Sequence, residues 1–145
     1  MIVKFILEMI YCFIASLFFA LIMNAPKKTL LITSLTASLG YLVYILCTEQ
    51  GFIKLGFFLG TTIIAFMGEI YARKFKMPAT IFIFPGVIPI VPGLGLYQTI
   101  LAFVQDNVFS ALEIGVNTIL NIGAMAIAMA LVSLIAMQIS LRKTE

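Results

Sequence analysis

Residues 84–97 read FPGVIPIVPGLGLY and lie at the centre of an apolar segment that covers residues 79–104. Its three prolines, Pro85, Pro89 and Pro92, lack a backbone donor, and each would clash in a helix with the carbonyl four residues earlier. We therefore expect no continuous helix through all three. In hydrocarbon an unpaired backbone group costs on the order of several kcal/mol, so we expect this stretch to be covered by protein or lined by water.

The composition indicates that the solvent around the chain is lipid. Hydrophobic residues make up 63% of the 145 residues, charged residues make up 10%, and mean hydropathy is +1.18. A soluble domain is roughly half apolar and a quarter charged. The charges fall in clusters between uncharged runs that approach the roughly 20 residues needed to cross a bilayer. The sequence predicts an all-α integral membrane protein, a single membrane domain over residues 1–145, with about five spans, the fourth of them broken, at residues 5–23, 30–47, 52–72, 79–104 and 109–140.

The distribution of lysine and arginine predicts an orientation, because cytoplasmic loops are enriched in both. With five crossings, one side receives seven cations and the other only Lys4 and Lys54; the seven are Lys27, Lys28, Arg73, Lys74, Lys76, Arg142 and Lys143. A fourth segment that entered and returned on one side would change the count to five and four. We expect a true crossing of the cytoplasmic membrane, with the amino terminus outside and the carboxyl terminus in the cytoplasm. The net charge of +3 then belongs to helix ends, and we expect no nucleic-acid binding.

Most enzyme classes are disfavoured by what the sequence lacks. It has no His, which removes the commonest general acid or base and a frequent metal ligand. Its two cysteines, Cys12 and Cys47, lie in apolar runs, where a free thiol behaves as a small hydrophobe. We expect no catalytic residues, no metal site and no cofactor.

The break in the fourth span is the main candidate for a substrate site. It lies near the bilayer midplane, where many transporters hold an anionic group at the free amides of a half-helix amino terminus. The second half-helix is expected to start near residues 93–95, where glycines let a ligand reach the backbone. The expected substrate-binding residues are Pro89, Pro92, Gly93, Gly95, Tyr97 and Gln98. The alternative is that the prolines only kink a packed helix.

Polar residues in the third and fifth spans give further candidates. Glu69 and Arg73 are four residues apart and can pair, either as a gate of the substrate path or as a structural anchor. In the fifth span Glu113, Asn117 and Asn121 recur at four-residue spacing. We expect Asn117 and Asn121 to line the outer half of a pathway, and interhelical hydrogen bonding is the equal alternative.

Two other features concern packing and the interface. Gly56, Gly60 and Gly68 are spaced by multiples of four in the third span, which leaves a face that another helix can approach closely. Glu8, in the first span, is expected at the membrane interface.

Residues 69–97 also carry a family pattern, Glu69-x-x-Ala72-Arg73, then Pro78, then Pro85-Gly86-x-x-Pro89-x-x-Pro92-Gly93-x-x-x-Tyr97. It resembles the small, carboxy-terminal half of the threonine/serine exporter family. In that family the two halves occur fused or as separate large and small membrane subunits. The resemblance implies a separate small subunit that works with a larger membrane subunit to export an amino acid or a dicarboxylate such as succinate.

We therefore expect one subunit of a secondary exporter of small carboxylate-bearing metabolites, not an enzyme. Its expected partners are the bilayer, the solute and the larger subunit. Two alternatives stay open: a structural or regulatory membrane subunit, in which the prolines only shape packing, and a homo-oligomeric channel, because the chain is small for a transporter. The substrate, the coupling ion and the subunit stoichiometry are not determined by the sequence.

Overall fold

The computed structural model describes residues 2–141, with side chains described for residues 4–139. Within that range the chain is helical and has no strand. Its elements are α1 (Ile2–Ile22), α2 (Lys27–Glu49), α3 (Ile53–Phe75), α4 (Thr80–Val87), the 3₁₀ turn η1 (Ile88–Ile90), α5 (Gly93–Val104) and α6 (Val108–Leu141). Four helices, α1, α2, α3 and α6, are long and apolar enough to cross a bilayer, and α4 and α5, bent by 57°, count as a fifth span if taken together. The expected fold class is confirmed.

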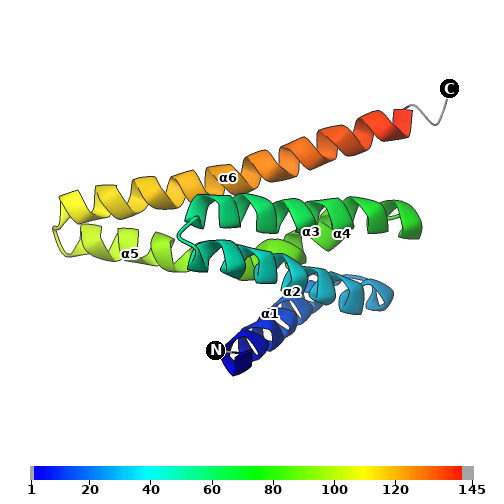
Figure 1. Cartoon of the computed structure of the whole chain (residues 1–145), viewed down its shortest axis with the longest axis horizontal. Helices are drawn as coiled ribbons and strands as arrows, with labels where there is room; N and C mark the ends of the chain where they lie inside the picture. Colours follow the sequence, from blue (N-terminus) through cyan, green and yellow to red (C-terminus); the bar gives the residue numbers. More distant parts are fainter. Residues whose placement is uncertain (1, 142–145) are drawn as a thin grey trace.

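Helix α4 occupies the middle of the bundle. α2 and α3 form an antiparallel hairpin, α6 runs along α3 on one side of it, and α1 packs against α2 on the other (Figure 1). α4 contacts α1, α2 and α3, so the first half of the broken span is enclosed by other helices. The buried apolar core joins α3, α4, η1 and α6 through Phe57, Ile64, Ala65, Ile83, Val87, Ile90, Met125 and Val132.

The glycine face of α3 brings two helices to backbone distance. A Cβ on Gly60 would lie 2.8 Å from the carbonyl oxygen of Gly40, and one on Gly56 would lie 2.9 Å from the carbonyl oxygen of Tyr44. Gly68 packs against α4 instead, because a Cβ on Gly68 would lie 2.6 Å from the side chain of Ile83. The expected close packing at this face is confirmed, and both partner helices belong to the same chain.

The three prolines of the opening stretch have different positions. Pro85 lies inside α4, fully buried, where it removes one helical donor without ending the helix. Pro89 lies in η1, and Pro92 is the N-cap residue of α5. The backbone leaves the helical region at Val91, with φ −53° and ψ 128°. The expected interruption is confirmed, and its position is Val91 and Pro92.

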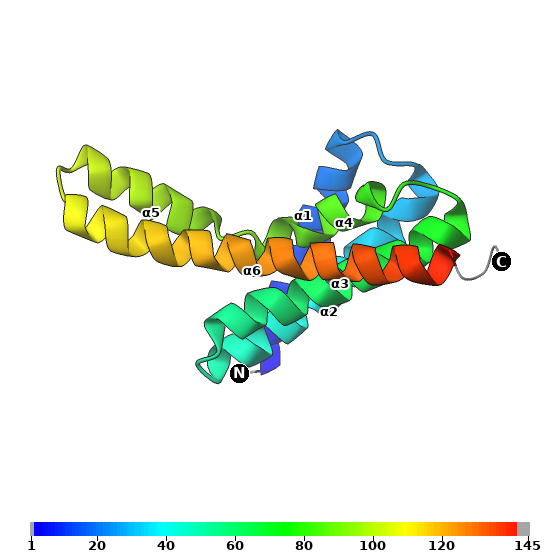
Figure 2. The same cartoon turned by 90° about the horizontal axis from the view of Figure 1, so that it is seen from above.

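Helix α5 leaves the bundle and forms an arm with the first half of α6 (Figure 2). In the turn between them Asp106 has φ 58°, and the amide of Asn107 donates to the carbonyl of Ala102 at 2.9 Å. At about 1.5 Å per residue, the 34 residues of α6 extend about 51 Å, against a hydrocarbon core of about 30 Å. α6 is therefore shared between the bundle and the arm.

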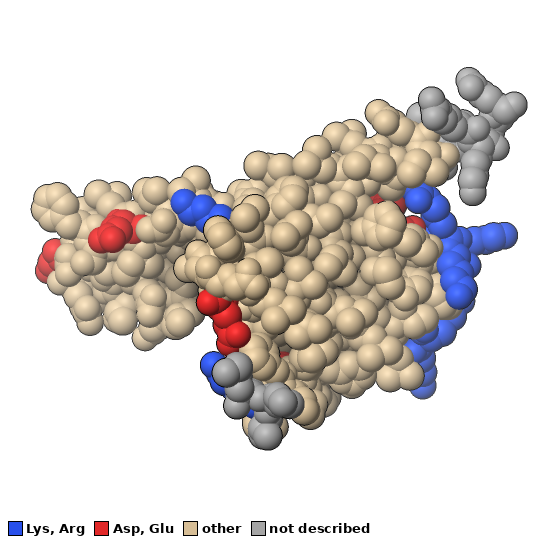
Figure 3. Space-filling view, viewed as in Figure 1, with Lys and Arg blue, Asp and Glu red and all other residues tan. Residues whose placement is uncertain are grey.

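Basic side chains gather at one end of the molecule (Figure 3). This is the end where α2 begins, with Lys27 and Lys28, and where α3 ends, with Arg73 and Lys74. Arg142 and Lys143, which also entered the cation count, lie outside the described residues. α4 starts at this basic end and α5 runs away from it, as a broken crossing requires (Figure 1).

Replacing Gly60 with Leu should weaken the α2–α3 hairpin, because the new side chain would have to displace the Gly40 backbone. Overpacking of this kind costs about 1–3 kcal/mol. We expect a clear fall in the temperature at which the purified protein aggregates in detergent. Gly123→Leu is the control, because a Cβ at Gly123 has nothing within 4 Å. Equal effects of the two substitutions would contradict this account of the hairpin.

Candidate functional site

The break leaves backbone donors free at the start of α5. The Gly93 amide donates to the carbonyl of Val91 at 2.7 Å, and the Leu96 amide donates to the carbonyl of Pro92 at 3.2 Å. Between them, the amides of Leu94 and Gly95 have no backbone acceptor within residues 2–141. Because the helix dipole is positive at this end, the two amides form a place where an anionic group is stabilised.

The two glycines expected at the site have different surroundings. Gly93 is exposed, and a Cβ there would have nothing within 4 Å, so the backbone is open. Gly95 faces α6, where a Cβ would collide with the side chain of Thr118. Its lack of a side chain is thus accounted for by helix packing, while its amide still belongs to the free pair.

Of the two asparagines on α6, only Asn121 lies level with the break. Gly95 abuts Thr118, and one turn towards the tip of the arm Gly115 abuts Thr99. Continuing this antiparallel register by one turn in the other direction brings Asn121, half-buried, beside Pro92. Asn117 is exposed, and its side-chain amide donates to the carbonyl of Glu113 at 3.1 Å, on its own helix.

Tyr97 lies one turn after Gly93 on the same exposed face of α5, whereas Gln98 lies on a different face. Tyr97 is 61% exposed. Gln98 lines a hollow of about 330 Å³ with Asn107 and Ser110, towards the tip of the arm. The structure therefore places Pro92, Gly93 and Gly95 at the start of α5, with Tyr97 one turn farther on, and the helix register puts Asn121 level with them. Gln98 and Asn117 lie apart from this group.

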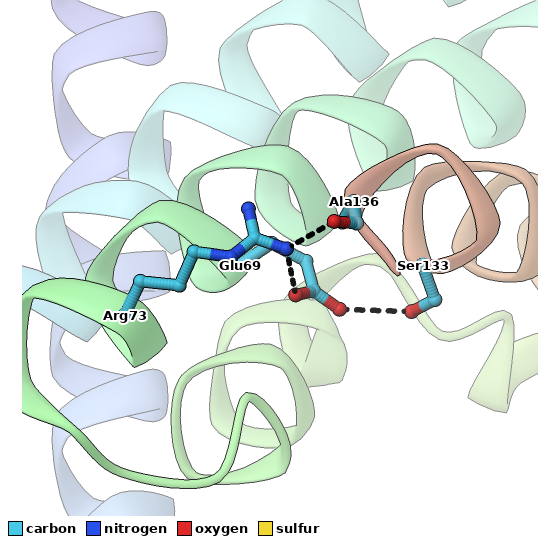
Figure 4. A network of polar contacts seen from close by, with 4 residues as sticks. All are labelled: Glu69, Arg73, Ser133 and Ala136. Atoms are coloured by element: carbon cyan, nitrogen blue, oxygen red, sulfur yellow. Dashed lines mark hydrogen bonds and ion pairs between the residues drawn. The ribbon is translucent and has the colours of Figure 1, made fainter. Parts of the chain in front are cut away.

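Glu69 and Arg73 join α3 to α6 (Figure 4). Nη2 of Arg73 lies 3.7 Å from a carboxylate oxygen of Glu69 and donates to the carbonyl of Ala136 at 2.6 Å. The hydroxyl of Ser133 donates to the other oxygen of Glu69 at 3.0 Å. The groove of about 190 Å³ beside this cluster is lined mainly by apolar side chains of the two helices. This geometry favours the anchor over the gate.

Sequence reasoning missed the buried hydroxyls of α2. Buried hydroxyls recur along it, at Thr29, Thr33, Ser34, Thr36 and Ser38. Most donate to the carbonyl of their own helix, but that of Ser38 also donates to the carbonyl of Met9 in α1, at 3.1 Å. Small hydroxyl residues let transmembrane helices approach closely, and Ser38 helps to fix α1 on α2. The recurrence of Ser and Thr in an apolar run was the signal.

Glu8 was expected at the interface and has a more specific position. It is partly buried, and it lines a hollow that also touches Pro89 of η1. A carboxylate of the first span therefore lies beside η1, the turn that precedes the break. The signal in the sequence was the spacing of Glu8, Cys12 and Ala15, which lie on one face of a helix.

Comparison with known proteins identifies the family of this chain. A family model described as "Threonine/Serine exporter, ThrE" matches residues 8–135. The chain is 26% identical to an uncharacterized protein of Haemophilus influenzae, over 91% of this chain and 48% of that protein. It thus spans about half the length of this relative. No solved structure matches the chain.

Replacing Arg73 with Met should loosen α6 from α3, because the Ala136 carbonyl and the Glu69 carboxylate both lose their donor. With the Arg73 side chain 44% exposed, we expect a loss of about 1 kcal/mol in the free energy of unfolding. Lys74→Met, one residue away on the same last turn, is the matched control. If the two variants are equally stable and only Arg73→Met alters export, the cluster is a gate and our account of it is wrong.

Proposed function

The chain belongs to the threonine/serine exporter family, and from this premise we propose that it is one membrane subunit of an exporter of threonine, serine or a related small carboxylate-bearing metabolite. The family is one of transporters and not of enzymes. Four or five apolar helices fit a multi-pass membrane protein.

The observation that carries this proposal is the pair of free amides at Leu94 and Gly95. They sit where α5 begins, next to the open backbone of Gly93. A carboxylate placed there accepts two hydrogen bonds and meets the positive end of the helix dipole. In our proposal Asn121, which the helix register puts level with Pro92, contributes its side-chain amide to the same site.

The depth of the break supports a transport site rather than a surface contact. α4 starts at Thr80 at the basic end, and the roughly ten residues from there to Ile90 rise about 15 Å, half of a core of about 30 Å. Irregular backbone at this depth requires protein or water around it. In our proposal a water-filled path on the α5 side supplies both the solvent and the route for the solute.

A larger membrane subunit is the partner we propose. The Haemophilus influenzae relative has about as much chain again beyond the part that matches, since the match covers 48% of it. The arm of α5 and α6 also exposes apolar side chains, among them Leu94, Ile100, Val104 and Phe109. A second membrane protein packed on the arm would close the far side of the path.

Efflux from preloaded cells tests the function directly. Cells that express this chain, with and without a candidate larger membrane subunit of the same family, would be loaded with radiolabelled threonine, serine or succinate. We expect efflux of at least one solute that needs both proteins. Efflux from cells with this chain alone would support a homo-oligomeric channel. Equal efflux from cells that lack this chain would show that the chain is a structural or regulatory subunit.

The double substitution Pro89→Ala with Pro92→Ala should restore backbone donors at the break and let the helix continue. We expect the initial rate of efflux to fall at least tenfold, with unchanged amounts of protein in the membrane. The measurement is the initial efflux rate divided by the amount of protein found on a membrane immunoblot.

Pro85→Ala is the matched control, because Pro85 lies inside α4 and does not form the break. Its efflux should stay near that of the parent. If the double variant exports normally, the prolines only shape packing, and the proposal for this site is wrong.

The orientation we propose places the basic end in the cytoplasm, following the positive-inside rule. In a chain with Cys12→Ser and Cys47→Ser, single cysteines would replace Gln50, Gln105 or Lys27, all exposed at helix ends. An impermeant thiol reagent added to intact cells should label the cysteines at positions 50 and 105 and not the one at 27. Labelling at 50 without labelling at 105 would contradict a true crossing by the broken span.

A further inference from the structure

A hollow between α1, α2 and η1 lies beside the turn that precedes the break. It has a volume of about 270 Å³ and is lined by Glu8, Tyr11, Cys12 and Ala15 of α1, Tyr41 of α2 and Pro89 of η1. Within the described residues α1 makes no contact with α5 or α6. The hollow lies against η1, just before the break, and the free amides of α5 lie just after it.

The charge of Glu8 is incompletely compensated. One of its carboxylate oxygens lies 3.8 Å from Nζ of Lys4, a long contact to a side chain that is 72% exposed. The other, Oε2, is buried and has no hydrogen-bond partner among the described residues. Glu8 also lies about 6 Å, one helical turn, farther into the span than Lys4. A carboxylate inside a membrane span is costly unless a cation accompanies it.

The rings beside Glu8 favour an organic cation. Tyr11 and Tyr41 line the same hollow. Tyrosine faces attract ammonium groups through the ring quadrupole, and a carboxylate accepts hydrogen bonds from them. The combination of one carboxylate and two tyrosines selects a primary ammonium group over an anion.

We propose that this hollow binds the ammonium group of the exported solute, with Glu8 as the acceptor. The inference rests on the proposed export function and deepens it, because it selects among the proposed substrates. An amino acid such as threonine offers an ammonium group to Glu8 and a carboxylate to the amides beyond the break. Succinate offers a second carboxylate, which the charge of Glu8 repels.

Protection of a cysteine in the hollow tests the proposal in membranes of cells that express the full chain together with the candidate larger subunit. Ala15 lines the hollow and is exposed, so Ala15→Cys in a Cys12→Ser, Cys47→Ser chain is the reporter for a small methanethiosulfonate reagent. The probes are threonine, 1-amino-2-propanol, which keeps only its ammonium group, and 2,3-dihydroxybutanoate, which keeps only its carboxylate. Sodium chloride at equal concentration serves as the inorganic cation.

We expect threonine and 1-amino-2-propanol to slow labelling at least threefold, and 2,3-dihydroxybutanoate and sodium chloride to leave it unchanged. Adding Glu8→Gln should abolish the protection, Glu8→Asp should restore part of it, and Glu113→Gln on the exposed arm should have no effect. The labelling rate without probe shows that each variant is folded. Absence of protection by both amines, or equal protection by sodium or by the carboxylate probe, overturns the proposal.

The two proposals fail separately. If efflux occurs but neither amine protects the cysteine at position 15, the ammonium site is wrong and the export function stands. If both amines protect through Glu8 but no efflux occurs under any pairing, the site stands and the export function is wrong.

Discussion

The fold depends on one constraint, that backbone polar groups in hydrocarbon need partners. The chain breaks a helix at Val91 and Pro92, and it can do so only because the preceding turn is enclosed. η1 contacts α1, α2 and α3, and Ile90 is only 2% exposed. Gly86 adds to this enclosure, because it lets the side chain of Ile64 pack against the backbone of α4. A Cβ on Gly86 would lie only 2.6 Å from that side chain. The donors left over, those of Leu94 and Gly95, lie where the chain leaves the enclosure.

The same constraint explains why small residues dominate the bundle. Apolar side chains gain little from leaving lipid for one another, so the helices gain stability from close contact instead. Gly40 on α2 and Gly60 on α3 bring two backbones together, and the hydroxyl of Ser38 reaches a carbonyl of α1. α2 can therefore hold α1 on one side and α3 on the other. This double contact positions α4, and with it the break.

The helices and the interruption could be predicted from the sequence. The length of an apolar segment and the effect of a proline on a helix depend mainly on residues close by in the chain. Such local rules could not place Pro85, which lies inside a helix whose surroundings tolerate the missing donor. Nor could they separate Gly93 from Gly95, since only the approach of Thr118 shows that the second glycine serves packing. Glu8 was assigned to the interface from its position in the sequence, whereas the hollow it shares with Pro89 results from the crossing of α1 over η1. Contacts between distant segments decided each of these cases.

The break has opposite chemistry on its two sides. After the break lie donors, the free amides at the start of α5, and beside η1, before the break, lies an acceptor, the carboxylate of Glu8. α1 and the arm make no contact with each other within the described residues, so only the bundle between them fixes their relation. Under our proposal a zwitterion fits this arrangement, because it carries charges of both signs. The carboxylate of such a solute pairs with the free amides that the prolines leave at the start of α5, and its ammonium group pairs with Glu8. An uncharged or doubly anionic solute leaves at least one of these groups unpaired.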